Sequence, residues 1–88
     1  MEEIRAELLK NRPALAISSQ TTYLSLLKSV HKKVFPDEEV KLENFFQIEK
    51  FIDYLKDLPM VKRKTTLAAL TVLTGDEEIR EMMMHDLS

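Results

Sequence analysis

The chain of 88 residues contains a single glycine, Gly75. Tight β-hairpin turns favour Asn-Gly or Asp-Gly pairs, and neither pair occurs in the sequence. The apolar residues instead recur at intervals of three and four positions, and the helix-forming residues leucine, lysine, glutamate and methionine are abundant. The sequence therefore predicts an all-α fold: a single compact domain of four to five short helices.

Five helical stretches follow from this spacing. Prolines end three of them, because proline interrupts a helix and disfavours a helical conformation at the residue before it. Within the single domain we expect a first helix and lead-in over residues 1–17, a three-helix core over 18–75 and a C-terminal helix over 76–88. The predicted helices are Glu2–Lys10, Thr21–Phe35, Phe45–Leu58, Val61–Thr74 and a last one that follows Gly75.

Polar residues and the glycine mark the predicted helix ends. Ser18 or Ser19 is the expected N-cap of the second helix, and Asn44 with Gln47 three residues later resembles a capping box for the third. The single glycine stands where a left-handed C-cap of the fourth helix belongs. Asp76 and the two glutamates after it suit the positive end of the last helix dipole.

Most catalytic and cofactor chemistry is excluded by residues that the chain lacks. Without cysteine there is no disulfide, thiolate metal site or cysteine nucleophile, and one glycine cannot form a phosphate-cradling nucleotide loop. His31 and His85 lack the spacing of paired metal ligands and are interpreted as solvated or partly buried. Tyr23 and Tyr54 lie on apolar helix faces, which indicates core positions. We expect no cofactor, no metal and no enzymatic activity.

The chain also lacks the signals of membrane insertion and secretion. No apolar run approaches the roughly 18 residues that a membrane span needs. The N-terminus is acidic and helical in pattern, unlike a signal peptide. We therefore expect an intracellular protein with no membrane partner.

Charge is unevenly distributed along the chain, although its net value is only −2. Residues 1–36 and residues 62–75 each carry a net +3, whereas residues 37–61 and 76–88 each carry −4. The local density of charge decides whether an anionic partner is attracted. The two basic segments are therefore the candidate contacts for such a partner.

The second basic segment opens the fourth helix. Lys62, Arg63 and Lys64 occupy a first turn, where the helix dipole makes cations unfavourable. A phosphate placed there would meet these cations, free backbone N–H groups and the hydroxyls of Thr65 and Thr66. The alternative is that the three cations are solvated and pair through space with acids of the third helix.

The first basic segment forms a stripe on the second helix, made of Lys28, Lys32 and Lys33. This stripe either assists the same contact or is a solvated face near a helix C-terminus, where cations are favourable. Sequence leaves open whether the two basic segments face the same side of the bundle.

Three consecutive methionines, Met82, Met83 and Met84, lie in the last helix. They span about 200° around it, so they cannot all face one core. At least one is expected to point outward, and methionine adapts well to a partner surface. They are the candidate protein interface, toward a catalytic domain or a second copy of the chain. The alternative is two core residues and one exposed side chain.

Three stretches of the chain resemble the core-binding domain of tyrosine recombinases, the phage-integrase type. Ser18–Lys28 is similar to the opening helix of that domain, with a Ser/Thr-rich turn followed by Thr, Tyr and Leu at helical spacing. Phe51–Leu55 is similar to its second helix and Lys64–Leu70 to its third. The lead-in Leu9–Pro13 is similar to integrase-like proteins of large DNA viruses, and the resemblance covers about residues 9–75.

The resemblance implies a SAM-like helical bundle that packs on one side of a DNA duplex and forms half of a clamp. It also implies a location in the cytoplasm or a host nucleus. The catalytic domain of that family, with its arginines, His-x-x-Arg element and nucleophilic tyrosine, is not represented in this sequence. The helix starts that match its DNA-facing positions are Thr21, Thr22, Lys62, Arg63, Lys64 and Thr65.

The first hypothesis is therefore a non-catalytic module of a recombinase-like protein that binds double-stranded DNA weakly in isolation. Lys62, Arg63, Lys64 and Thr65 would contact phosphates, with the lysine stripe of the second helix assisting. The alternative hypothesis is a helical protein-interaction or oligomerisation domain with no nucleic-acid role, which the net charge and the methionines favour.

Overall fold

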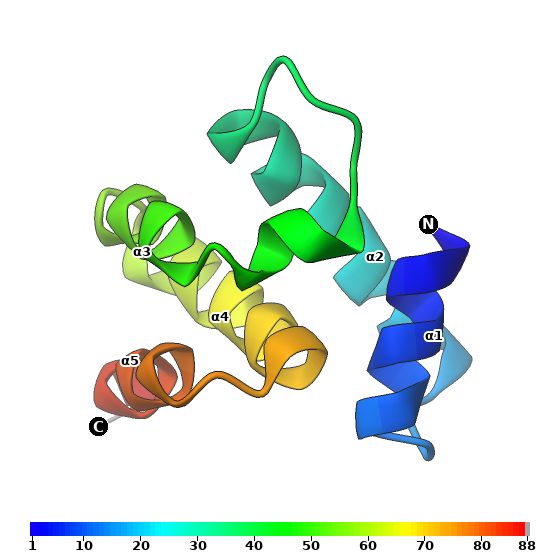
Figure 1. The fold of residues 1–88 in the computed structure, drawn as a ribbon. Helices are drawn as coiled ribbons and strands as arrows, with labels where there is room; N and C mark the ends of the chain where they lie inside the picture. Colours follow the sequence, from blue (N-terminus) through cyan, green and yellow to red (C-terminus); the bar gives the residue numbers. More distant parts are fainter. Residues whose placement is uncertain (88) are drawn as a thin grey trace.

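Helices joined by short loops make up the part of the chain that the structure describes, without strands in it. The computed structural model covers the backbone of residues 1–87 and the side chains of residues 1–85; Ser88, the end of the predicted C-terminal helix, lies outside the described residues. The predicted all-α bundle is confirmed. Its elements, labelled in Figure 1, are α1 (Glu2–Asn11), α2 (Ile17–Val34), the 3₁₀ helix η1 (Leu42–Phe46), α3 (Ile48–Lys56), α4 (Met60–Thr74) and α5 (Glu77–Leu87).

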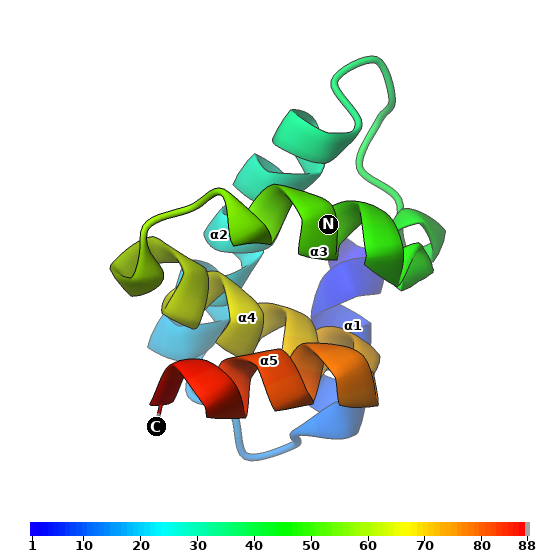
Figure 2. The ribbon, with the colours of Figure 1, turned by 90° about the vertical axis from the view of Figure 1, so that its left-hand side faces the viewer.

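Helix α4 lies at the centre of the bundle. Figure 2 shows it at the level between α3 and α5, with α1 and α2 behind. Its second half is apolar on most sides, which is typical of a helix enclosed by neighbours. Leu67, Ala69, Leu70 and Leu73 are fully buried there. Ala69, without a bulky side chain, lets a neighbouring helix approach closely.

Helix α1 packs on the bundle of its own chain. Its apolar stripe, Ile4 and Leu8, is buried in the common core, and α1 contacts both α2 and α4. At its C-terminal end the Asn11 Nδ2 amide donates to the carbonyl oxygens of Val72 and Leu73, at 2.9 Å in each case. The last-turn carbonyls of a helix have no partner within it. Asn11 therefore caps the end of α4 from another helix.

Replacing Asn11 by alanine should lower the free energy of unfolding by about 1–2 kcal/mol, because two carbonyl oxygens lose their donor. Asn11→Asp should lower it further, since a carboxylate cannot donate and would face the negative end of the α4 dipole. Urea unfolding followed by circular dichroism measures both changes. An alanine variant within about 0.5 kcal/mol of the wild type would show that the amide contributes nothing measurable.

Two of the predicted caps are wrong, one is confirmed, and one cap was not predicted. Helix α2 begins at Ile17, before either serine, and its N-cap is Ala16. The predicted third helix is divided: Asn44 is a buried member of η1, and α3 begins only after Gln47, without a side-chain cap. Gly75 does end α4 in the left-handed conformation, with φ of 66°. The carboxylate of Asp76 accepts the backbone N–H of Ile79 at 3.1 Å, so it caps α5.

Asn44 takes part in a buried cluster instead of a cap. Its Nδ2 amide donates to Nε2 of His31, 3.0 Å away, and both side chains are buried. The interpretation of His31 as solvated or partly buried is therefore wrong, because its ring lies in the core. His85 is exposed. Tyr23 and Tyr54 are half-buried against the core, as predicted.

Three phenylalanine rings complete this cluster at the junction of α2, η1 and α3. The His31 ring centroid lies 5.2 Å from that of Phe35 and 5.3 Å from that of Phe45. Phe51 stacks on Phe45 at 5.4 Å and lies tilted against Phe35 at 5.7 Å. The cluster fixes the C-terminal half of α2 relative to α3.

Candidate nucleic-acid interface

A groove of about 500 Å³ runs between α2 and the start of α4, with the end of α3 closing one side. On α2 its lining residues are spaced by four, three, one and three positions, so they form one face of the helix. On α4 they belong to the first two turns. The lining residues of this α2–α4 groove are Thr22, Leu26, Ser29, Val30, Lys33, Tyr54, Leu58, Val61, Lys62, Thr65 and Thr66.

The groove brings the two basic segments together. Lys33 from the first segment and Lys62 from the second both line it and are both exposed, together with Thr22 and Thr65. The acidic stretch that separates the segments in sequence contributes no carboxylate to the lining. The lining lacks carboxylates although the chain as a whole has more acidic residues, 15, than basic ones, 13. The α2–α4 groove is therefore locally basic on a protein whose net charge is −2.

The other predicted contact residues lie outside this lining. Thr21, Lys28, Lys32 and Lys64 are exposed but do not line the groove. Lys64 lies about 200° around the helix from Lys62, so the two side chains point to different sides of α4. Of the three basic residues singled out in each segment, only one therefore lines the groove.

Arg63 is partly buried and turned toward the protein. Its Nη1 donates to the carbonyl oxygen of Leu58 at 3.5 Å, just beyond the end of α3. This contact ties the start of α4 to the preceding turn. Arg63 therefore helps to hold the groove wall in place, a role that sequence spacing did not suggest.

The threonine hydroxyls near the groove donate to their own helices. Thr22 donates to the Ser18 carbonyl at 3.0 Å and Thr65 to the Val61 carbonyl at 3.5 Å. Thr66 was expected to offer a hydroxyl to phosphate, but it is buried and donates to the Lys62 carbonyl at 3.0 Å. The long Thr65 bond is the weakest of the three and the easiest to redirect to a ligand. On the remaining predicted threonine, Thr21, the hydroxyl donates to the Ile17 carbonyl at 3.1 Å.

Part of the groove lining is apolar, and sequence reasoning missed it. Leu26, Val30, Leu58 and Val61 contribute carbon surface to the same lining as the two lysines. Leu26 lies beside the apolar stripe predicted for α2, and Val61 was regarded only as the first residue of the fourth helix. The available signal was an apolar residue next to each basic segment.

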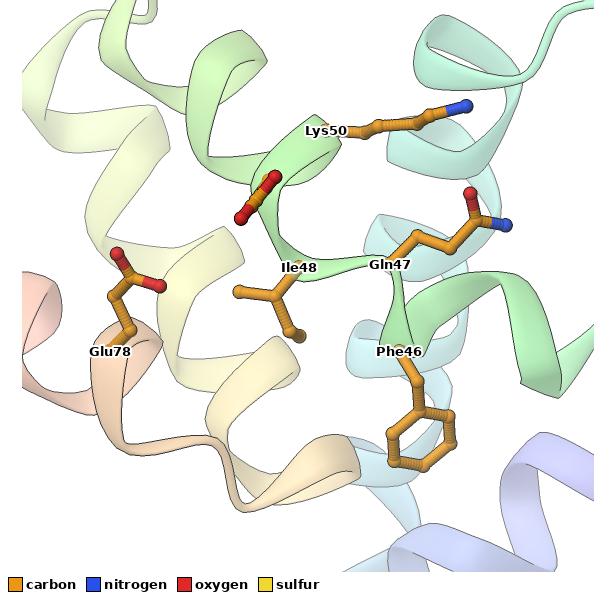
Figure 3. Close-up of a pocket in the computed structure, with 6 residues that line it drawn as sticks. Phe46, Gln47, Ile48, Lys50 and Glu78 are labelled. Carbon is orange, nitrogen blue, oxygen red and sulfur yellow. The ribbon is translucent and has the colours of Figure 1, made fainter.

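A second hollow, of about 370 Å³, lies between η1, α3 and α5 and is drawn in Figure 3. Glu49 and Glu78 line it, together with Phe46, Gln47, Ile48 and Lys50. Figure 3 shows Glu78 directed toward Ile48, whereas the Lys50 side chain extends away from both. Nζ of Lys50 lies 5.1 Å from the Phe35 ring centroid, in a cation–π contact. The two carboxylates make this hollow unsuited to a phosphate.

The methionines of α5 divide as the spacing predicts. Met84 is 59% exposed, whereas Met82 and Met83 are half-buried against the core. One side chain of the three therefore points outward. Its use as a protein interface stays a prediction.

Among the described residues, no three side chains of the types that bind metals lie close enough together to hold an ion. None of the described helices combines the length and the apolar character needed to cross a bilayer. Compared with protein-family models, curated protein sequences and solved structures, the chain matches none of them.

Proposed function

We propose that this protein is a non-catalytic module that binds duplex DNA, as the core-binding domains that its sequence resembles do, and that it binds through the α2–α4 groove. One observation carries the proposal: two basic segments separated by an acidic stretch meet in one groove whose lining contains no carboxylate. Lysine ammonium groups are effective contacts for phosphate oxygens, and most protein–DNA hydrogen bonds go to phosphate and sugar. Lys33 and Lys62 would bind phosphates, and Thr22 and Thr65 line the same groove.

The basic lining also explains how an acidic protein attracts a polyanion. Most carboxylates lie on other surfaces, and charges separated by more than a Debye length of about 8–10 Å are largely screened at physiological salt. The local electrostatic potential of the groove, more than the net charge of the protein, then determines whether DNA is attracted to it. With few lysines in contact, we expect affinities for random duplex in the range of about 10⁻⁴ to 10⁻⁶ M.

The double variant Lys33→Ala with Lys62→Ala should weaken duplex binding by roughly tenfold for each lost phosphate contact near 0.1 M salt. The slope of log affinity against log salt should become shallower by about 0.9 per lysine. The matched control is Lys32→Ala with Lys64→Ala, which removes the same charge from the same two helices outside the groove. Fluorescence anisotropy of a labelled duplex of about 30 bp, titrated at several salt concentrations, measures both quantities.

Equal losses in the two double variants would contradict the assignment to the groove, because they would show an effect of net charge only. Absence of duplex binding by the wild type at low salt would contradict DNA binding altogether. Circular dichroism should show that both variants fold, since all four lysines are exposed.

The exposed Met84 favours a second candidate function, association with another protein. An isolated apolar side chain is common on surfaces, but Met84 lies on the acidic helix α5, which contributes no residue to the α2–α4 groove. Replacing Met84 by aspartate should leave the fold intact and abolish any dimer seen by light scattering. If the wild type is monomeric at high concentration, self-association through α5 is contradicted.

A further inference from the structure

The most exposed large apolar side chain of the described residues lies in the proposed DNA-binding groove. Val61 is 80% exposed, and it lines the α2–α4 groove next to Lys62. Met60, immediately before it, is 55% exposed. Such side chains do not bind phosphates, because phosphate oxygens interact with cations and hydrogen-bond donors. An exposed valine that lines the same groove as two lysines is therefore available to an apolar group on the partner that the lysines bind.

Duplex DNA offers one apolar group at this place. The major groove is wide enough to admit a helix, and its base edges are lined with hydrogen-bond donors and acceptors apart from the C5-methyl group of thymine. If Lys33 and Lys62 lie against the phosphates that border the DNA major groove, the start of α4 faces the base edges between those phosphates. We infer that Val61 contacts a thymine methyl group in the major groove and makes the domain prefer A·T base pairs. This inference rests on the proposed function.

The chemistry of valine suits such a contact. A β-branched side chain in a helix adopts one strongly preferred rotamer, so its methyl groups are held in place before binding and little side-chain entropy is lost. Met60 is also exposed, but it has three rotatable bonds and would lose more freedom on contact. Val61 is therefore the residue that can read the methyl group, and Met60 is a secondary contact.

Two duplexes that differ only in the thymine methyl groups provide the test. One is an alternating A·T duplex, which presents a thymine in every register; the other has deoxyuridine in place of every thymine and carries the same phosphate charge. The wild type should bind the thymine duplex about fourfold more tightly, the effect of one buried methyl group. In Val61→Ala this preference should disappear, with the affinity for the uridine duplex unchanged.

Ile17→Ala is the matched control, because Ile17 is 78% exposed on α2 and does not line the groove. It should keep the full preference for thymine. Both variants should melt like the wild type, since each removes an exposed side chain and alanine favours helices.

Equal binding of the two duplexes by the wild type would overturn the inference while leaving DNA binding intact. A thymine preference that persists in Val61→Ala would also overturn it, because another residue would then make the contact. Failure of the wild type to bind either duplex would instead overturn the proposed function, and the inference with it.

Discussion

Replacing Phe45 by alanine should lower the free energy of unfolding by about 3–5 kcal/mol. The ring is fully buried, stacked on Phe51 with 5.4 Å between centroids and tilted against His31 at 5.3 Å. Its removal leaves a cavity that its neighbours cannot fill, since their positions are fixed by three different elements. A domain of this size has a total stability on the order of 4–13 kcal/mol, so this loss is a large fraction of it.

Phe46 provides the matched control within the same 3₁₀ helix. It is 49% exposed, so Phe46→Ala removes the same atoms at a much smaller loss of buried area, and we expect a change below about 1 kcal/mol. Urea denaturation of both variants gives the comparison. Similar losses at the two positions would show that the ring cluster at the junction of α2, η1 and α3 does not hold the fold together.

Acidification should destabilise the protein through His31. Burial lowers the pKa of His31 from its ordinary value of 6.5, and the Glu38 carboxylate offsets part of that effect. The ring accepts the Asn44 amide through Nε2, so the proton of the neutral ring lies on Nδ1, which has no hydrogen-bond partner among the described residues. A second proton on Nε2 would face the Asn44 donor and break this bond.

The direction of the pH effect follows from the two pKa values. His31 takes up its proton near pH 6.5 in the unfolded chain and only at a lower pH in the folded chain. Between these two pH values the unfolded state therefore binds more protons than the folded state. The free energy of unfolding therefore has its full value above pH 6.5 and falls as the pH drops from there through the lowered pKa. Each unit by which the pKa is lowered corresponds to about 1.4 kcal/mol.

Urea unfolding at a series of pH values on both sides of 6.5 measures this effect. The control is His31→Gln, whose amide oxygen can still accept from Asn44 but does not titrate. The wild type should lose stability on acidification more steeply than this variant. Parallel pH profiles would show that protonation of His31 is not coupled to unfolding.

The helix content and the ends set by backbone chemistry could be predicted from the sequence. Gly75 ends α4 because a residue without a side chain adopts positive φ at little cost, and the prolines stop helices by sterics that act locally. Asn44 could not be placed in the same way. Its amide has a choice between a local cap and His31, which lies 13 residues away, and the tertiary bond forms because a buried ring nitrogen needs a donor.

The candidate site could be predicted only in part for a similar reason. The sequence identifies two basic segments, but only the crossing of α2 with α4 selects Lys33 and Lys62 from them. Likewise, Val61 looked like an ordinary helix residue until its neighbours across the groove were known. A pattern along one helix indicates which face is apolar, whereas the partner of its polar face depends on contacts between distant parts of the chain.

The bonds from Asn11 to α4 bear on the order in which the protein assembles. They join residues 61 and 62 positions apart, so α1 is made first and reaches α4 only when most of the chain exists. A helix of 10 residues is marginal alone in water, and the entropy of closing a long loop has to be overcome before its contacts stabilise the chain. We therefore expect α2, α3 and α4 to associate early in refolding. The N-terminal helix should dock last, and it should be the first to exchange its amide hydrogens with solvent.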